Sequence, residues 1–291
     1  MSKYIKVFDT VEQYNAYSGG TAFTSPNISY IKSTDETKYD DNEIKHYSED
    51  GDSWIITEEI GSAITHCVDT IINVKIPNTV EVLGSECFSN LYYLESVEIP
   101  SSVTTIGERC FYGCSRLKTV NYPNISYIPN YCFDICYKLD YFDLPSTITT
   151  IGAYAFDECT GFTDVTIHSG VTSIGAYAYS RCGSLSSVTL SEGLESIGER
   201  AFGFDYNLKE LTIPSTVTSI GALILYDENY SKTITVLATT PPNLSGKLVH
   251  SVWNDRQTIY VPDESVEAYK SATNWSLYKN RIKPISEKPN N

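Results

Sequence analysis

A motif of 22 or 23 residues repeats eight times between Ile60 and Val236, and it constrains the fold more than any other feature. Its anchor is an aliphatic residue followed by a small turn residue, usually Ile-Gly. The anchors are Ile60, Leu83, Ile106, Ile128, Ile151, Ile174, Ile197 and Ile220. Successive anchors are 23 residues apart, except for the 22 residues before Ile128, where Ile-Pro replaces Ile-Gly. A fixed period of this length predicts a solenoid of stacked turns.

Each repeat contains a short strand pattern in which two apolar residues enclose a polar one. Because side chains alternate along a strand, the apolar pair points inward and the middle residue points outward. The predicted strands are 74–76, 97–99, 120–122, 142–144, 165–167, 188–190, 211–213 and 234–236. Stacking makes them a parallel sheet, and the bulkier segments on the opposite side bend the stack. We therefore expect the sheet face to be concave.

Two further columns of apolar residues recur in register and predict a continuous core. The aromatic column is Phe88, Phe111, Phe133, Phe156, Tyr179 and Phe202. The second column is Leu94, Leu117, Leu139, Phe162, Leu185 and Leu208. No single turn buries these side chains alone, so neighbouring turns must cover one another.

The cysteines also follow the repeat. Cys87, Cys110 and Cys132 share one position, where later repeats carry Ala155, Ala178 and Ala201. Cys114, Cys136, Cys159 and Cys182 share a second position, three residues after the aromatic one. A position that alternates between Cys and Ala requires a small buried group, so these columns predict packing. The alternative is a metal or redox site, but no His or carboxylate recurs in register to complete a zinc site.

Segments of different character flank the repeats and divide the chain into four parts. Residues 1–42 predict a small α+β module, with a capping box that begins a helix at Val11. Residues 43–59 predict a hairpin around Asp50-Gly51 that caps the solenoid at 60–236. Residues 237–291 predict a second cap with a strand at 258–261 and a helix at 262–270. We expect five of its side chains to cover the last turn: Val266, Tyr269, Trp275, Leu277 and Ile282.

Charge and hydropathy exclude several classes of function. The net charge of −15 disfavours a nucleic acid partner, because an acidic surface repels the phosphate backbone. No run of 18 apolar residues predicts a membrane span, and the N-terminus has no apolar core typical of a signal peptide. The chain is therefore expected to be made in a cytoplasm and not exported by the usual route.

The repeat, with the pattern LxxVxIPxSVTxIGxxAFxxCxx, resembles the BspA-like (treponema-type) leucine-rich repeat over about Ile60 to Val236. The segment YVPDESVEAYKSATNWSLYKNRIKPI, residues 260–285, is similar to the ending common on such proteins from gut Bacteroidales. The resemblance implies a surface or secreted protein that adheres to host proteins or to other cells, and it implies no enzymatic activity. The fold class expected is an α/β solenoid with about eight turns.

The N-terminal stretch departs from that family. Its sequence, VFDTVEQYNAY and SPNISYIKSTDETKYDDNE, resembles short modules in structural proteins of phages that infect those bacteria. This resemblance implies a virion surface protein, fibre-like or decorating, that docks to other structural proteins through residues 1–42. The alternative is an adhesin on a bacterial cell surface. Fibre proteins are commonly trimers, so a homo-oligomer is possible, although no heptad stalk is visible.

The search for catalytic chemistry finds little. The four histidines, His46, His66, His168 and His250, have no paired spacing, and no phosphate loop, HExxH or GxSxG motif occurs. We expect that the protein is not an enzyme and that it binds no cofactor and no metal. The remote alternative is a glycan-acting enzyme, for which Asp143 and Asp164 would be the carboxylate pair.

The outward residues of the predicted sheet are the candidate binding residues. They form a column with flanking positions, and a rigid sheet presents such side chains to a protein or glycan ligand without an ordering cost. The candidates are Lys75, Glu98, Asn121, Tyr141, Asp143, Asp164, Thr166, Thr189, Glu210 and Thr212. The competing interpretation is that these polar residues only keep an exposed sheet soluble.

Overall fold

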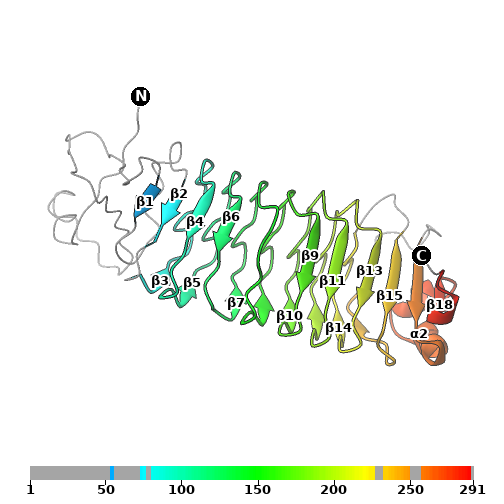
Figure 1. The fold of residues 1–291 in the computed structure, drawn as a ribbon. Coiled ribbons are helices and arrows are strands. Elements are labelled where there is room, and N and C mark those ends of the chain that lie inside the picture. The colour runs from blue at the N-terminus through cyan, green and yellow to red at the C-terminus, as the bar shows by residue number, and fades with distance from the viewer. Residues whose placement is uncertain (1–52, 56–72, 77–79, 227–231, 250–256, 290–291) are drawn as a thin grey trace, which may run out of the picture. The chain divides into compact units, whose positions relative to one another are not determined.

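The computed structural model describes residues 53–55, 73–76, 80–226, 232–249 and 257–289 (Figure 1). The predicted module at 1–42, most of the predicted hairpin at 43–59 and the anchor Ile60 lie outside these residues. The structure is a parallel β-solenoid, as the repeat predicted. It has about nine turns where about eight were expected, and it contains little helix.

The chain divides into two compact units. The N-terminal unit comprises residues 1–125 and 131–145, and the C-terminal unit comprises residues 126–130 and 146–291. Each unit is a stack of turns, and in each the strands of successive turns pair in parallel (Figure 1).

The N-terminal unit contains two sheets. The larger has the order β1-β2-β4-β6, formed by Ser53–Ile55, Asn73–Lys75, Ser96–Glu98 and Thr119–Asn121. The smaller pairs β3, Val82–Leu83, with β5, Thr105–Ile106. β1 pairs in parallel with β2, so it extends the sheet of the solenoid beyond the first described repeat.

The C-terminal unit contains three sheets. One pairs β9, Asp164–Ile167, with β11, Ser187–Leu190. Another has the order β13-β15-β17-β18, formed by Glu210–Ile213, Thr233–Val236, Thr258–Val261 and Ile282–Pro284. The third has six two-residue strands in the order β16-β14-β12-β10-β8-β7: Asn243–Leu244, Ser219–Ile220, Ser196–Ile197, Ser173–Ile174, Thr150–Ile151 and Tyr127–Ile128.

Seven of the eight predicted strands are present, and the one predicted at 142–144 is wrong. At this position Phe142 replaces the usual aliphatic residue. Its ring packs against Tyr122 and Phe133, with centroids 5.5 and 5.2 Å away and planes tilted by 58° and 59°. Three tilted rings occupy more space than a pair of aliphatic side chains, and we attribute the loss of regular strand pairing to this cluster.

In each described anchor, the aliphatic residue and the residue before it form a two-residue strand that the repeat pattern did not predict. The glycine is required because the preceding turn lies against it. A Cβ added to Gly175 would lie 2.5 Å from the main-chain nitrogen of Ala153, and one added to Gly221 would lie 2.2 Å from that of Glu199. No side chain larger than hydrogen fits this spacing without moving the backbone.

The segments opposite the larger sheets are turns, which explains the low helix content. They contain non-glycine residues with positive φ at four-residue spacing, such as Tyr177 at 58° and Arg181 at 56°. Left-handed residues at this interval interrupt any α-helix. Main-chain bonds between turns replace those of a helix: Phe88 N donates to Cys110 O at 2.9 Å, and Tyr179 N donates to Ala201 O at 2.9 Å.

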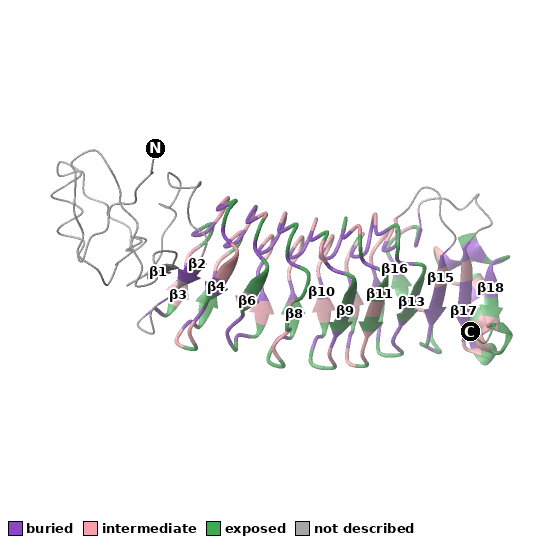
Figure 2. Ribbon diagram, turned by 45° about the horizontal axis from the view of Figure 1, so that its top comes forward, coloured by how far each residue is buried: buried purple, intermediate pink, exposed green. Residues whose placement is uncertain are grey.

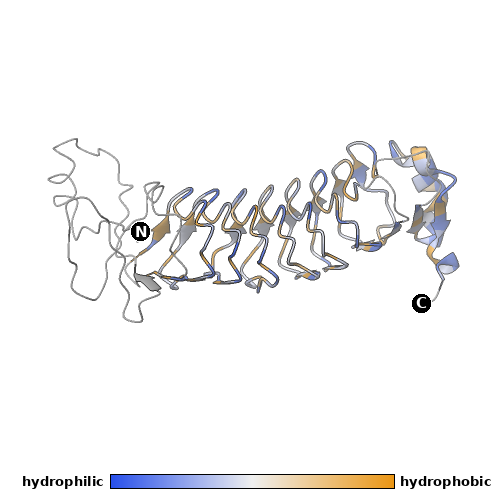
Figure 3. Ribbon diagram, turned by 90° about the horizontal axis from the view of Figure 1, so that it is seen from above, coloured by the Kyte–Doolittle hydropathy of each residue, from blue (hydrophilic) through white to orange (hydrophobic). Residues whose placement is uncertain are grey.

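The predicted core columns are confirmed. Within the N-terminal unit the rings of Phe88 and Phe111 stack with centroids 5.2 Å apart, and within the C-terminal unit those of Phe156 and Tyr179 stack at 5.1 Å. Figures 2 and 3 show buried and hydrophobic positions recurring at the same place in successive turns. Each fully buried ring contributes about 1.5–3 kcal/mol relative to an exposed one, so stacking is the main source of stability.

The C-terminal segment extends the stack and then folds over its end. After β17 come two short helical segments, Asp263–Ser265 (η1) and Val266–Ser271 (α2), followed by η2, Trp275–Tyr278, then β18 and η3, Ile285–Glu287. Tyr269, Trp275 and Ile282 are buried as predicted, and Val266 is half-buried. The prediction for Leu277 is wrong, because its side chain is 49% exposed and Tyr278 is buried instead. Tyr278 accepts a hydrogen bond from Leu248 N at 2.8 Å, which fixes this register.

Candidate binding face

The outward side chains of the larger sheets form the candidate binding face, which we call the sheet face in each unit. In the N-terminal unit it consists of the outward residues of β4, β6 and the segment 139–145. In the C-terminal unit it consists of those of β9, β11 and β13. Nine of the ten predicted residues are exposed: Glu98, Asn121, Tyr141, Asp143, Asp164, Thr166, Thr189, Glu210 and Thr212. The side chain of Lys75 lies outside the described residues.

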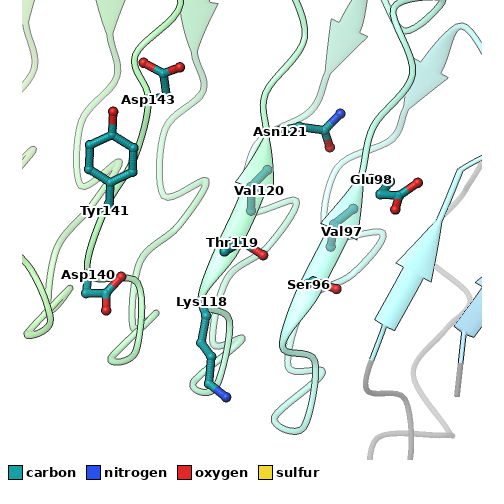
Figure 4. Close-up of a pocket in the computed structure, with 10 residues that line it drawn as sticks. All are labelled: Ser96, Val97, Glu98, Lys118, Thr119, Val120, Asn121, Asp140, Tyr141 and Asp143. Carbon is teal, nitrogen blue, oxygen red and sulfur yellow. The ribbon is translucent and has the colours of Figure 1, made fainter.

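A groove of about 510 Å³ lies on the sheet face of the N-terminal unit. Figure 4 shows Tyr141 between Asp140 and Asp143 on one segment, with Asn121 and Glu98 on the two adjacent strands. The lining residues are Ser96, Val97, Glu98, Lys118, Thr119, Val120, Asn121, Asp140, Tyr141 and Asp143. The structure therefore brings four of the predicted residues together: Glu98, Asn121, Tyr141 and Asp143.

Two predicted residues are held by the scaffold. Asn121 Oδ1 accepts from Ile99 N at 2.7 Å, and its Nδ2 donates to Ile99 O at 2.9 Å. The amide of Asn121 thus bonds the main chain of the neighbouring strand. On the C-terminal unit, Glu210 Oε2 lies 3.6 Å from Lys288 Nζ, so that carboxylate has an ion-pair partner.

The sheet face of the C-terminal unit has a different character. Asp164, Thr166, Thr189 and Thr212 are exposed along it, and each is small. The next residue of the column is Thr235, which is buried and whose hydroxyl lies 3.1 Å from Lys288 Nζ. Figure 2 shows β15 and β17 as largely buried strands. The column is therefore covered at Thr235 and Tyr260, and it is exposed again at Lys283 on β18.

The candidate set omitted two charged residues that line the groove. Lys118 comes directly before Thr119, and Asp140 comes directly before Tyr141. Thr119 and Tyr141 are outward residues, so strict alternation along the strand does not assign their predecessors to the outward face. Lys118 Nζ forms an ion pair with Glu95 Oε2 at 2.7 Å, on the preceding turn. Such residues can be found in the sequence as charged residues in the turn just before a strand. The alternation of side chains within the strand does not identify them.

Buried charge lies elsewhere, within the core of the C-terminal unit. Asp157 Oδ2 contacts Arg181 Nη1 at 2.5 Å. Burial raises the pKa of Asp157 to about 6, although the Arg181 guanidinium opposes this shift. Burial also raises the pKa of Asp205 well above its usual range. In the described part of the chain, no three His, Cys, Asp or Glu side chains gather so as to hold a metal ion.

The comparisons with known proteins agree on the repeat. The family model described as "BspA type Leucine rich repeat region" matches six copies, over residues 58–152 and 126–241. A leucine rich cell surface protein from Faecalibacterium prausnitzii has a similar solved structure, with 25% identity and a TM-score of 0.50. That match covers 75% of this chain and 68% of the other.

A leucine-rich repeat protein of T. pallidum is also similar, at 28% identity and a TM-score of 0.48, covering 60% of this chain and 81% of the other. No curated protein sequence matches. Across the described residues, no helix combines the length and the hydropathy that crossing a bilayer requires.

Proposed function

Because the chain belongs to the family of BspA-type leucine-rich repeat proteins, we propose that it is a non-enzymatic interaction protein whose sheet face recognises a ligand. The observation that carries this proposal is the groove around Tyr141, on a scaffold whose core side chains are almost wholly buried. Side chains on paired strands are already ordered, so binding them costs little conformational entropy.

An adhesive role at a surface is the setting that the comparisons favour. The similarity to the F. prausnitzii cell surface protein supports a place on a bacterial cell surface. The resemblance of residues 1–42 to phage structural modules supports a place on a virion, docked through those residues. In either setting the solenoid would bind the protein or glycan ligand. That the chain forms a homo-oligomer remains a prediction.

Mass spectrometry of fractions from the source culture tests the placement. The chain should be recovered either with cell envelopes or with purified phage particles. Recovery in envelopes alone contradicts the virion placement, and recovery in particles alone contradicts the cell-surface placement. Recovery only in the cytosolic fraction contradicts both, and with them the surface role.

Ligand binding is tested by exposing the labelled full chain to an array of purified extracellular-matrix proteins and glycans. At least one of these molecules should bind, and Tyr141→Ala should weaken that binding. Tyr206→Ala is the matched control, since Tyr206 is another exposed tyrosine but lies in the C-terminal unit. An array without a bound molecule, or equal loss in both variants, contradicts the proposal.

The enzymatic alternative rests on the carboxylates of Asp143 and Asp164 alone. A glycosidase needs two carboxyl groups on either side of the scissile bond. We infer that neither residue is catalytic and that the protein is not an enzyme. Replacing both with Asn should therefore leave any hydrolytic activity of the preparation unchanged, and loss of such an activity would contradict this inference.

A further inference from the structure

Tyr141 occupies a position where other turns carry small or polar side chains. The equivalent residues are Asn73, Ser96, Thr119, Asp164, Ser187, Glu210 and Thr233. The Tyr141 side chain is 68% exposed, the largest value among the exposed apolar side chains of the described residues. Because the other turns form without an aromatic residue here, the fold does not require the ring. Exposed aromatic rings are instead typical of binding surfaces.

The two carboxylates beside this ring have no partner among the described residues. In the described part of the chain, Asp140 and Asp143 form no ion pair and no side-chain hydrogen bond, and Tyr141 makes no ring contact. Two other surface carboxylates have a lysine partner: Glu95 pairs with Lys118, and Glu210 pairs with Lys288. The groove thus combines an uncovered ring with two uncompensated negative charges.

Elsewhere the chain covers its own tyrosines with arginines. The guanidinium carbon of Arg109 lies 4.4 Å from the ring centroid of Tyr131, and that of Arg116 lies 4.5 Å from that of Tyr93. Such cation–π contacts are worth about 0.5–1 kcal/mol at exposed sites and more when water is excluded. Tyr141 has the ring and the neighbouring carboxylates, but no arginine or lysine of the described residues lies over it.

We propose that the groove binds an extended, lysine- or arginine-bearing segment of a partner protein, with one cationic side chain over the Tyr141 ring between Asp140 and Asp143. This inference rests on the proposed function and names the ligand class of the same face. The groove crosses turns that are about 4.8 Å apart, so it is long enough for a few extended residues. Charge complementarity selects the cationic partner, and the overall charge of −15 assists its approach.

The test uses the full chain and a nonapeptide of alternating lysine and serine, with binding followed by calorimetry at low salt. Tyr141→Ala should weaken binding about two- to fivefold, as loss of one exposed cation–π contact implies. Tyr141→Phe should stay within about twofold, because the ring is retained. Weakening by Tyr141→Phe as large as by Tyr141→Ala would contradict the proposed contact.

The charge is tested with a matched pair of double variants. Asp140→Asn with Asp143→Asn removes two charges from the groove, and Glu195→Gln with Glu264→Gln removes two exposed charges from the C-terminal unit. The groove variant should weaken peptide binding about fivefold or more, an effect that shrinks as salt rises, and the control should change it less than twofold. Equal weakening would show nonspecific attraction to an acidic protein and would overturn the inference.

A panel of neutral oligosaccharides separates this inference from the proposed function. If an oligosaccharide binds with an affinity that depends on Tyr141, while the peptide does not bind, the ligand class is wrong and the recognition role stands. If neither the peptide, the oligosaccharides nor the array molecules bind in a manner that depends on Tyr141, both proposals fail.

Discussion

The thiol of Cys114 donates a hydrogen bond to the main-chain carbonyl of Phe88 on the preceding turn, with 3.1 Å between Sγ and O. Cys136 donates to Phe111 O and Cys182 to Phe156 O in the same way, each at 3.3 Å. This bond explains why the second cysteine column keeps Cys, while the first changes to Ala in the C-terminal unit. Each of these carbonyls also accepts from the main-chain N–H three residues further on, so the thiol supplies a second donor, which alanine cannot replace.

Replacing Cys114 with Ala should therefore destabilise the protein by about 1–3 kcal/mol, because it leaves a small cavity and removes one of the two donors to the Phe88 carbonyl, the other being Leu91 N at 3.4 Å. Cys110→Ala is the matched control, because alanine occupies the equivalent position in three later turns. Cys110→Ala should lower the free energy of unfolding clearly less than Cys114→Ala does. Chemical denaturation measures both, and an equal or larger loss for Cys110→Ala would contradict the assigned role of the thiol.

Gly175→Ala should be strongly destabilising, by about 1–3 kcal/mol or more, because the added Cβ meets the backbone of the preceding turn at 2.5 Å. Gly183 provides the control in the same repeat, since a Cβ there has no atom within 4 Å. Gly183→Ala should leave the melting temperature nearly unchanged. Similar melting temperatures for the two variants would show that the anchor glycine is not required by turn spacing.

Asp157 should make stability depend on pH in an unusual direction. Its pKa is raised by burial from 3.8 to about 6, so between about pH 4 and 6 the folded state binds more protons than the unfolded state. Stability must therefore fall as pH rises through this window, by on the order of 3 kcal/mol in total. The facing charges are those of Arg181, Glu158 and Asp205.

The variant Asp157→Asn has no titrating group at this position, so its stability should fall less steeply between pH 4 and 6. Thermal unfolding at half-unit steps of pH measures the slopes of the two proteins. Asp205 contributes to both slopes in the same direction, so the difference between the curves reports Asp157 together with its charge interaction with Asp205. Parallel curves would contradict the raised pKa.

The repeat predicted most of the fold because a fixed period and strict alternation describe inward and outward positions directly. Strands such as Val165–Ile167 and the stacked Phe156 and Tyr179 follow from that pattern alone. The absence of a strand at 142–144 does not follow from the pattern, because it depends on how three aromatic rings pack against one another. Left-handed residues such as Tyr177 were also missed, since their conformation is imposed by bonds between turns and not by local propensity.

The candidate site was predictable in part for the same reason. Alternation identified Tyr141 and Asp143 as outward residues, and their exposure confirms that orientation. It gave no means of separating them from Thr189 or Thr212, which are equally outward. What distinguishes Tyr141 is the groove around it, and this depends on neighbouring turns and on the corner residue Asp140.

The central claim is that the sheet face of the N-terminal unit contacts the ligand, and hydrogen–deuterium exchange tests it most directly. The exchange of the full chain is measured alone and with the array molecule that it binds most tightly. Binding should slow exchange in residues 94–100, 117–122 and 139–145, and should leave 163–168 and 186–191 unchanged. Protection confined to the C-terminal unit, or no protection in the three groove segments, would contradict the claim.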